Sequence, residues 1–185
     1  MNNASLRQPL NAEACYQNGE IYLQVQNYPA AFYHFKLAFR AGSAKACTAL
    51  AELYMHGSGV HKDWRMVQLW LLRAINNPIP DHRAMVLYAR SEPARSTLDA
   101  LKLSLCYLRR GVKAKQLTCI KESIKIYQEI QQQYGSKENL RNFYRFLNFS
   151  IECLKGNSNL EMFLRLEQTR IYATYGHPIE IFNHD

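Results

Sequence analysis

The residues with the clearest chemical potential lie in one short segment, where His56 and His61 flank a Gly-Ser-Gly run at 57–59 and Asp63 follows. A glycine-rich loop can cradle a phosphate or present a serine nucleophile, and two histidines with an aspartate can hold a metal ion. The segment lacks the third glycine of a dinucleotide loop and the Gly-Lys-Ser/Thr end of a nucleotide loop. Ligands spread along an extended turn also seldom converge on one ion. We therefore interpret the segment as a turn between helices and predict no catalytic residue, metal site or cofactor.

The densest basic run of the chain is the second group with chemical potential. It consists of Arg109, Arg110, Lys113 and Lys115 and is followed by Lys121 and Lys125. Cations at a helix C-terminus complement the helix dipole, which explains the run structurally. The same charges could contact an anionic partner if aromatic or polar groups converge on the same surface. Segment 109–125 is therefore a candidate site for nucleic acid, an acidic protein or lipid head groups.

The five cysteines, Cys15, Cys47, Cys106, Cys119 and Cys153, are odd in number and far apart. This pattern favours reduced thiols over a disulfide framework or a zinc site. The first residues carry no apolar segment behind a basic end, so we expect no signal peptide. We expect a cytoplasmic protein without an integral membrane segment, with delivery as an effector through a specialised secretion system as the alternative. The formal net charge of +8 is compatible with anionic partners but does not choose among them.

Apolar residues recur at three- and four-residue spacing nearly everywhere, and alternating strand-type patterns are absent. Three stripes illustrate this: Leu98, Leu101, Leu105, Leu108 and Val112; Leu117, Ile120, Ile124 and Tyr127; and Leu140, Phe143, Leu147, Ile151 and Leu154. Ser136 and Gly156 have the residue types expected just before and just after a helix. We predict an all-α chain of antiparallel helix pairs, with a last helix from about Asn159 to Gly176.

Prolines make 76–81 the most loop-like stretch of the chain, because each proline lacks an N–H and disfavours helix in the residue before it. We predict an N-terminal arm over 1–11 and two helix pairs over 12–80. Divergent helix pairs over 81–176 are expected to complete and cap the same stack, and 177–185 is predicted as a tail.

The segment 46–75 resembles a Sel-one-like repeat. That family has small residues and a tyrosine on a first helix, a Gly-x-Gly-Val turn, an aspartate, then an aromatic and a small residue on a second helix. The matching residues are Ala46, Tyr54, Gly57, Gly59, Val60, Asp63, Trp70 and Ala74. The family's Leu-Gly reads Leu50-Ala51 here, and its Lys-Ala reads Met66-Val67.

The preceding segment is similar to the related tetratricopeptide repeat, whose pattern is matched by Gly19, Tyr22, Ala31, Phe35 and Ala38. Together the two resemblances cover residues 12–75. They imply a short α-solenoid superhelix whose concave wall is built from the first helices of the pairs. Proteins of these families act as adaptors, scaffolds or chaperones, and in bacteria some belong to secretion or host-interaction systems.

Transfer of the tetratricopeptide groove positions to this chain gives a candidate partner-binding set. It comprises Tyr16, Glu20, Leu23 and Gln24 from the first pair, and Thr48, Glu52 and Met55 from the second. The resemblance therefore implies a non-enzymatic module that binds another protein or peptide on its concave face. An anionic partner on segment 109–125 is the alternative function.

Overall fold

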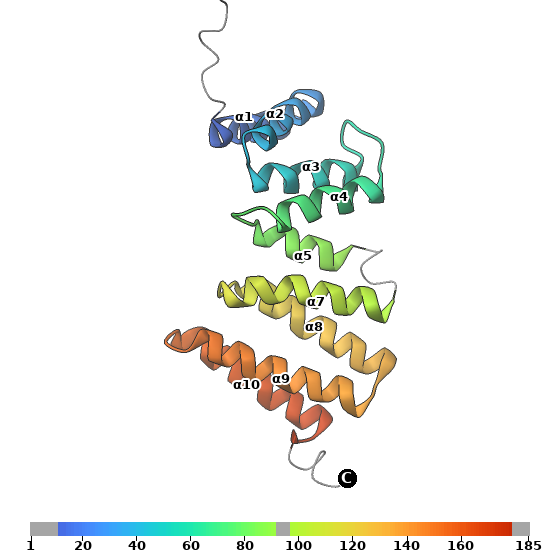
Figure 1. The fold of residues 1–185 in the computed structure, drawn as a ribbon, viewed down its shortest axis with the longest axis vertical. Helices are drawn as coiled ribbons and strands as arrows, with labels where there is room; N and C mark the ends of the chain where they lie inside the picture. The colour runs from blue at the N-terminus through green and yellow to red at the C-terminus, as the bar shows by residue number, and fades with distance from the viewer. Residues whose placement is uncertain (1–10, 92–96, 179–185) are drawn as a thin grey trace, which may run out of the picture. The chain divides into compact units, whose positions relative to one another are not determined.

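The computed structural model describes residues 11–91 and 97–178 (Figure 1). Within these ranges every regular element is a helix, which confirms the predicted all-α class. Residues 1–10 of the predicted arm over 1–11 and residues 179–185 of the predicted tail over 177–185 lie outside the described residues, and Asn11 is the N-cap of α1. No helix in the described ranges has the length and apolar character needed to span a bilayer.

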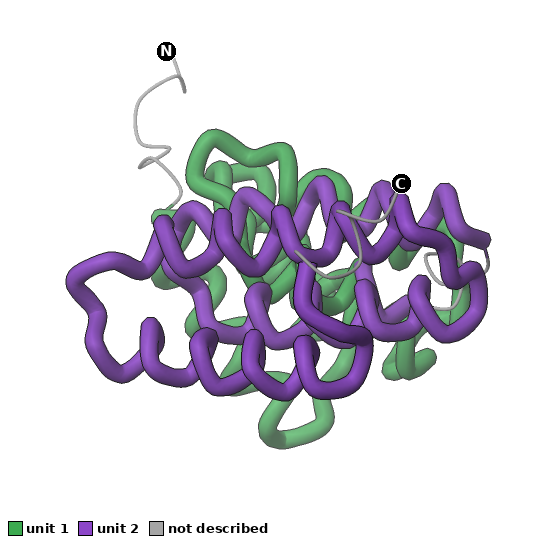
Figure 2. The backbone as a smooth tube through the Cα atoms, turned by 90° about the horizontal axis from the view of Figure 1, so that it is seen from below, with its two compact units in different colours: residues 1–88 green, residues 89–185 purple. Residues whose placement is uncertain are grey.

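The chain divides into two compact units, Met1–Tyr88 and Ala89–Asp185 (Figure 2). Unit 1 contains α1 (Ala12–Gln24), α2 (Tyr28–Arg40), α3 (Ala44–His56), α4 (Trp64–Ile75) and most of α5 (His82–Arg90). Helix α1 packs on α2 and α3 packs on α4, and α2 also contacts α3. Consecutive antiparallel pairs of this kind are the arrangement of an α-solenoid.

Local sequence explains where the helices of unit 1 begin. The Asp63 carboxylate accepts hydrogen bonds from the backbone N–H groups of Arg65 and Met66 at 2.8 and 3.3 Å, so Asp63 is the N-cap of α4. Asn27 caps α2 in the same way through the N–H of Ala30. The predicted turn is also confirmed, because Gly57 and Gly59 have φ values of 72° and 71°.

The seam of unit 1 is built from small residues and large rings, as the repeat pattern predicts. Ala46, Ala51 and Ala74 are fully buried, so the helix backbones approach closely. The Trp70 side chain is 3% exposed, and its ring centroid lies 5.1 Å from that of Phe39 in an edge-to-face contact. Tyr54 is half-buried and meets the Phe32 ring edge-on.

Unit 2 contains α7 (Leu98–Lys113), α8 (Leu117–Tyr134), α9 (Lys137–Leu154) and α10 (Ser158–Tyr175). Helix α7 packs on α8 and α9 packs on α10, while α9 also contacts α7 and α8. The three predicted apolar stripes lie on α7, α8 and α9, and Leu101, Ile120 and Phe143 are among their fully buried members. Ser136 caps α9 through the N–H of Asn139, as predicted. The last helix begins one residue earlier than predicted, because Asn157 caps it.

The loop over 76–81 is confirmed between α4 and α5, but the division between the units falls further along the chain, within α5. The start of α5 lies in unit 1, and side-chain contacts join α3 to Asp81, just before α5, and to Arg83 within it. Thr48 Oγ1 donates to Asp81 Oδ2 at 2.6 Å, and Arg83 forms an ion pair with Glu52. The proline-rich loop is therefore internal to unit 1.

Candidate functional site

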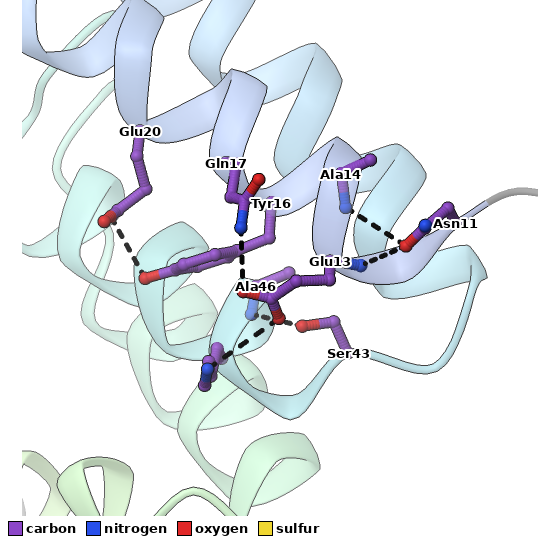
Figure 3. Close-up of polar contacts among 9 residues, drawn as sticks. Asn11, Glu13, Ala14, Tyr16, Gln17, Glu20, Ser43 and Ala46 are labelled. Carbon is purple, nitrogen blue, oxygen red and sulfur yellow. Dashed lines mark hydrogen bonds and ion pairs between the residues drawn. The ribbon is translucent and has the colours of Figure 1, made fainter.

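The first candidate surface lies in unit 1, where residues of α1 and α3 and the start of α5 form what we call the α1–α3 face. Tyr16 is half-buried against the Phe35 ring, and its hydroxyl donates to Glu20 Oε1 at 3.0 Å (Figure 3). Burial, followed by this bond to Glu20, raises the pKa of the Tyr16 phenol above its ordinary value. The hydroxyl therefore stays protonated and holds the Glu20 carboxylate in place.

Glu52 lies on the same face, and its Oε1 accepts from the Arg83 guanidinium at 2.5 Å. The ion pair lowers the pKa of Glu52, but burial acts in the opposite direction and is larger, so the pKa is raised. Burial prevails because the side chain of Arg83 is 62% exposed, and solvent screens its charge. Arg83 thus stabilises the charged form of the Glu52 carboxyl, and partial burial disfavours that form more strongly.

The predicted partner-binding residues on the α1–α3 face differ in how available they are. Thr48 is 1% exposed and its hydroxyl is taken by Asp81, so its side chain belongs to the packing and not to the surface. Gln24 is exposed, whereas Leu23 and Met55 are half-buried. Asp81 and Arg83 join this face although they were not predicted. The position of Asp81 just before α5, where it accepts from the N–H of Arg83 at 3.0 Å, is the pattern that could have revealed it.

Unit 2 contains a cavity of about 440 Å³, which we call the α7–α9 cavity. It is lined by Lys102, Leu105, Cys106 and Arg109 of α7, by Tyr127 and Ile130 of α8, and by Asn139, Asn142, Arg145, Phe146 and Phe149 of α9. Aromatic rings form one wall: the Tyr127 ring lies 5.0 Å from Phe146 and stacks on Phe143 at 5.1 Å. The lining combines apolar rings, amides and cations, and none of these residues is acidic.

Arg109 is the member of the predicted basic run that reaches this cavity. Its guanidinium carbon lies 4.5 Å from the centroid of the Phe149 ring, which is a cation–π contact. Burial raises the pKa of the Tyr127 phenol, and the charge of Arg109 opposes that rise without cancelling it. Tyr127 therefore offers a neutral hydroxyl toward the same space.

The other predicted cations lie elsewhere. Arg110, Lys113 and Lys115 are exposed around the C-terminal end of α7, where they complement the helix dipole. Lys121 and Lys125 line a separate cavity of about 500 Å³ between α8 and α10, where the Lys121 ammonium lies 5.2 Å from the Phe163 ring centroid. Segment 109–125 is therefore not one continuous basic patch.

Sequence reasoning missed Lys102, Asn142 and Arg145 as candidate site residues. A pattern was present, since Lys102, Cys106 and Arg109 recur at four and three residues along α7, as do Asn139, Asn142, Arg145 and Phe149 along α9. Residues at these spacings share one helix face. The spacing does not show that this face of α7 packs toward this face of α9.

The Gly-Ser-Gly run at 57–59 is a turn between α3 and α4. Within residues 11–91 and 97–178, no three side chains of His, Cys, Asp or Glu gather as a metal site. Comparison of the chain with protein-family models, with curated protein sequences and with solved structures gave no match.

Proposed function

We propose that this chain is a non-enzymatic protein-interaction module of the Sel-one-like and tetratricopeptide-like kind, which holds a segment of another protein against the first helices of its helix pairs. The observation that carries the proposal is the α7–α9 cavity, in which aromatic rings, amides and cations converge on α7 and α9. Aromatic and arginine side chains are enriched where proteins bind each other, because they combine large contact area with directional bonds.

The α1–α3 face supports the same proposal less strongly. Glu20 and Glu52 hold fixed carboxylates on a face where the helix packing needs no acid. Their bonds to Tyr16 and Arg83 are satisfied within the chain, so a partner gains less by binding them. In an adaptor, scaffold or chaperone, the α1–α3 face would add a weaker second contact with the partner protein.

The alternative is an anionic polymer held by segment 109–125. Arg109 at the α7–α9 cavity favours an anionic group, but Lys121 and Lys125 line the other cavity. A polymer needs cations that continue along its path. We therefore prefer a protein partner.

The test is affinity capture with mass spectrometry, using the wild type and two variants that each add one tyrosine. Asn142→Tyr fills the α7–α9 cavity without changing charge. Gln133→Tyr, on an exposed position of α8 outside both cavities, is the matched control. Proteins captured by the wild type and the control but lost with Asn142→Tyr are the expected result, with thermal unfolding showing that all three chains are folded. Identical capture by all three would rule out the cavity as the binding site.

The contribution of the α1–α3 face is measured in the same experiment with the double change Glu20→Ala and Glu52→Ala. Weaker capture of the same partners is expected. Unchanged capture would restrict recognition to unit 2.

A further inference from the structure

Three cationic side chains surround the α7–α9 cavity without a carboxylate among them. Lys102 and Arg109 come from α7 and Arg145 from α9. In the part of the chain that the structure describes, none of the three forms an ion pair. On α10, by contrast, Arg165 and Arg170 pair with Glu161 and Glu167 at 2.8 and 3.0 Å.

The convergence of like charges on one cavity has a physical consequence. Like charges repel one another, and solvent weakens this repulsion between exposed side chains without abolishing it. An anion placed among them would relieve it and gain attraction from all three. The charges around the cavity therefore favour an anionic ligand over a cationic one.

The aromatic wall of the cavity favours a second property in the ligand, an apolar group. Tyr127 and Phe149 are half-buried and, with the edge of the largely buried Phe146, offer ring surface that a wholly polar ligand would leave in contact with water. The Phe149 ring also holds the Arg109 guanidinium in place, which reduces the entropy lost when Arg109 binds a carboxylate. A ligand that satisfies the site must carry both an apolar group and negative charge.

We propose that the α7–α9 cavity binds an acidic segment of a partner protein in which glutamate or aspartate residues flank one large apolar residue. The apolar side chain packs on Tyr127 and Phe146, and the flanking carboxylates bond to Arg109, Arg145 and Lys102. All three cations are exposed at the rim, where a chain passing over the cavity can reach them. This inference rests on the proposed function and names the chemistry of the partner.

The test uses fluorescein-labelled synthetic peptides and fluorescence anisotropy. The first peptide has a leucine flanked by glutamates on both sides, the second replaces its glutamates with glutamine, and the third replaces its leucine with glycine. Each is titrated against the wild type and two double variants. Arg109→Gln with Arg145→Gln removes cations from the cavity, and Arg110→Gln with Lys113→Gln removes as many from the exposed end of α7.

The acidic leucine peptide is expected to bind the wild type and the Arg110/Lys113 variant equally. Its affinity for the Arg109/Arg145 variant should fall by about tenfold or more, because two charge-assisted contacts are lost. Both substituted peptides should bind the wild type more weakly than the parent. Arg109→Lys with Arg145→Lys, which keeps the charge, should recover part of the affinity and shows that a loss in the glutamine variant is not a folding defect.

The reactivity of the Cys106 thiol reports whether a peptide occupies the α7–α9 cavity, because Cys106 lines the cavity and is exposed. The bound acidic peptide should slow the reaction of this thiol with a neutral maleimide. Cys106→Ser identifies the labelled residue by removing that reaction.

Four results would overturn the inference. Equal binding of the glutamine peptide would show that the site does not respond to charge. Equal losses of affinity in the Arg109/Arg145 and Arg110/Lys113 glutamine variants would show unspecific attraction to the basic chain. Tighter binding of a single-stranded oligonucleotide that also depends on Arg109 and Arg145 would assign the cavity to a polyanion. No binding of any peptide would reject this ligand class. The proposed function is judged separately by the capture experiment with Asn142→Tyr, which leaves every charge in place.

Discussion

At the scale of single residues, Trp70 tests the packing of unit 1. Trp70→Ala is expected to lower the free energy of unfolding by about 3–5 kcal/mol, because it removes a buried ring and leaves a cavity beside Phe39. Chemical denaturation followed by circular dichroism measures this. Trp64→Ala is the matched control, since the other tryptophan is half-buried at the start of α4 and should cost on the order of 1 kcal/mol or less. Equal losses at both positions would contradict the packing described.

The Trp70 indole N–H is buried without a hydrogen-bond partner. An unsatisfied buried donor is destabilising, so Trp70→Phe should cost much less than Trp70→Ala. We therefore expect the ring volume of Trp70, and not its N–H group, to stabilise the fold.

Glu52 predicts a pH dependence of stability. Its folded-state pKa lies above the ordinary value of 4.5, mainly through burial, so the folded chain holds a proton that the unfolded chain has already released. Stability should therefore fall as the pH rises from about 4.5 through the folded-state pKa. Glu52→Gln should remove this decline, as measured by denaturation across the pH range. Arg83→Gln should steepen it, because the opposing cation is lost.

An identical pH profile for the wild type and Glu52→Gln would show that burial does not perturb this carboxyl. A smaller loss of stability with rising pH in Arg83→Gln would contradict the conclusion that Arg83 lowers the pKa of Glu52.

At the scale of elements, the contact between the start of α2 and the turn between α3 and α4 is testable. Gly59 has a φ of 71°, and a Cβ at this position would collide with the Tyr28 Cβ at the start of α2. Gly42 also has a positive φ, of 94°, but a Cβ there would meet no atom within 4 Å. Each Gly→Ala change should cost about 1–2 kcal/mol for the backbone alone. Gly59→Ala should cost measurably more, and equal costs would show that α2 does not press on this turn.

The helix termini explain why the elements were predictable. Asp63, Ser136 and the glycine after α9 act over a few residues, so their residue types report local structure directly. Helix α10 begins one residue before the predicted start. Asn157, Ser158 and Asn159 are all residue types that can cap a helix, so residue type does not show that Asn157 is the cap.

At the scale of the whole molecule, the distribution of the thiols predicts that the stability of the fold does not depend on a bound metal ion. Cys47, Cys106 and Cys119 lie on three different helices, and Cys47 and Cys119 are buried. A structural zinc site needs four converging ligands. A chelator should therefore leave the thermal unfolding midpoint unchanged, and elemental analysis should find no bound metal. Stoichiometric zinc in the purified protein would refute this.

The net charge of +8 is a property of the whole chain, but its effect depends on where the charges lie. Arg109 faces the α7–α9 cavity, Lys121 lines the other cavity, and Arg110 lies exposed near the end of α7. The basic segment that is continuous in sequence is thereby divided among separate surfaces of unit 2.

The sequence by itself determined the all-α class, several helix ends and the turn between α3 and α4 within the described residues. These depend on interactions between residues a few positions apart, such as Asp63 with Met66, which residue type and spacing report. Only the tertiary structure decided that Asp81 bonds to Thr48, and that Arg145 of α9 shares a cavity with Lys102 and Arg109 of α7. Those contacts depend on the rotation and crossing of packed helices, which are set by the volumes of many core side chains together and not by any local pattern.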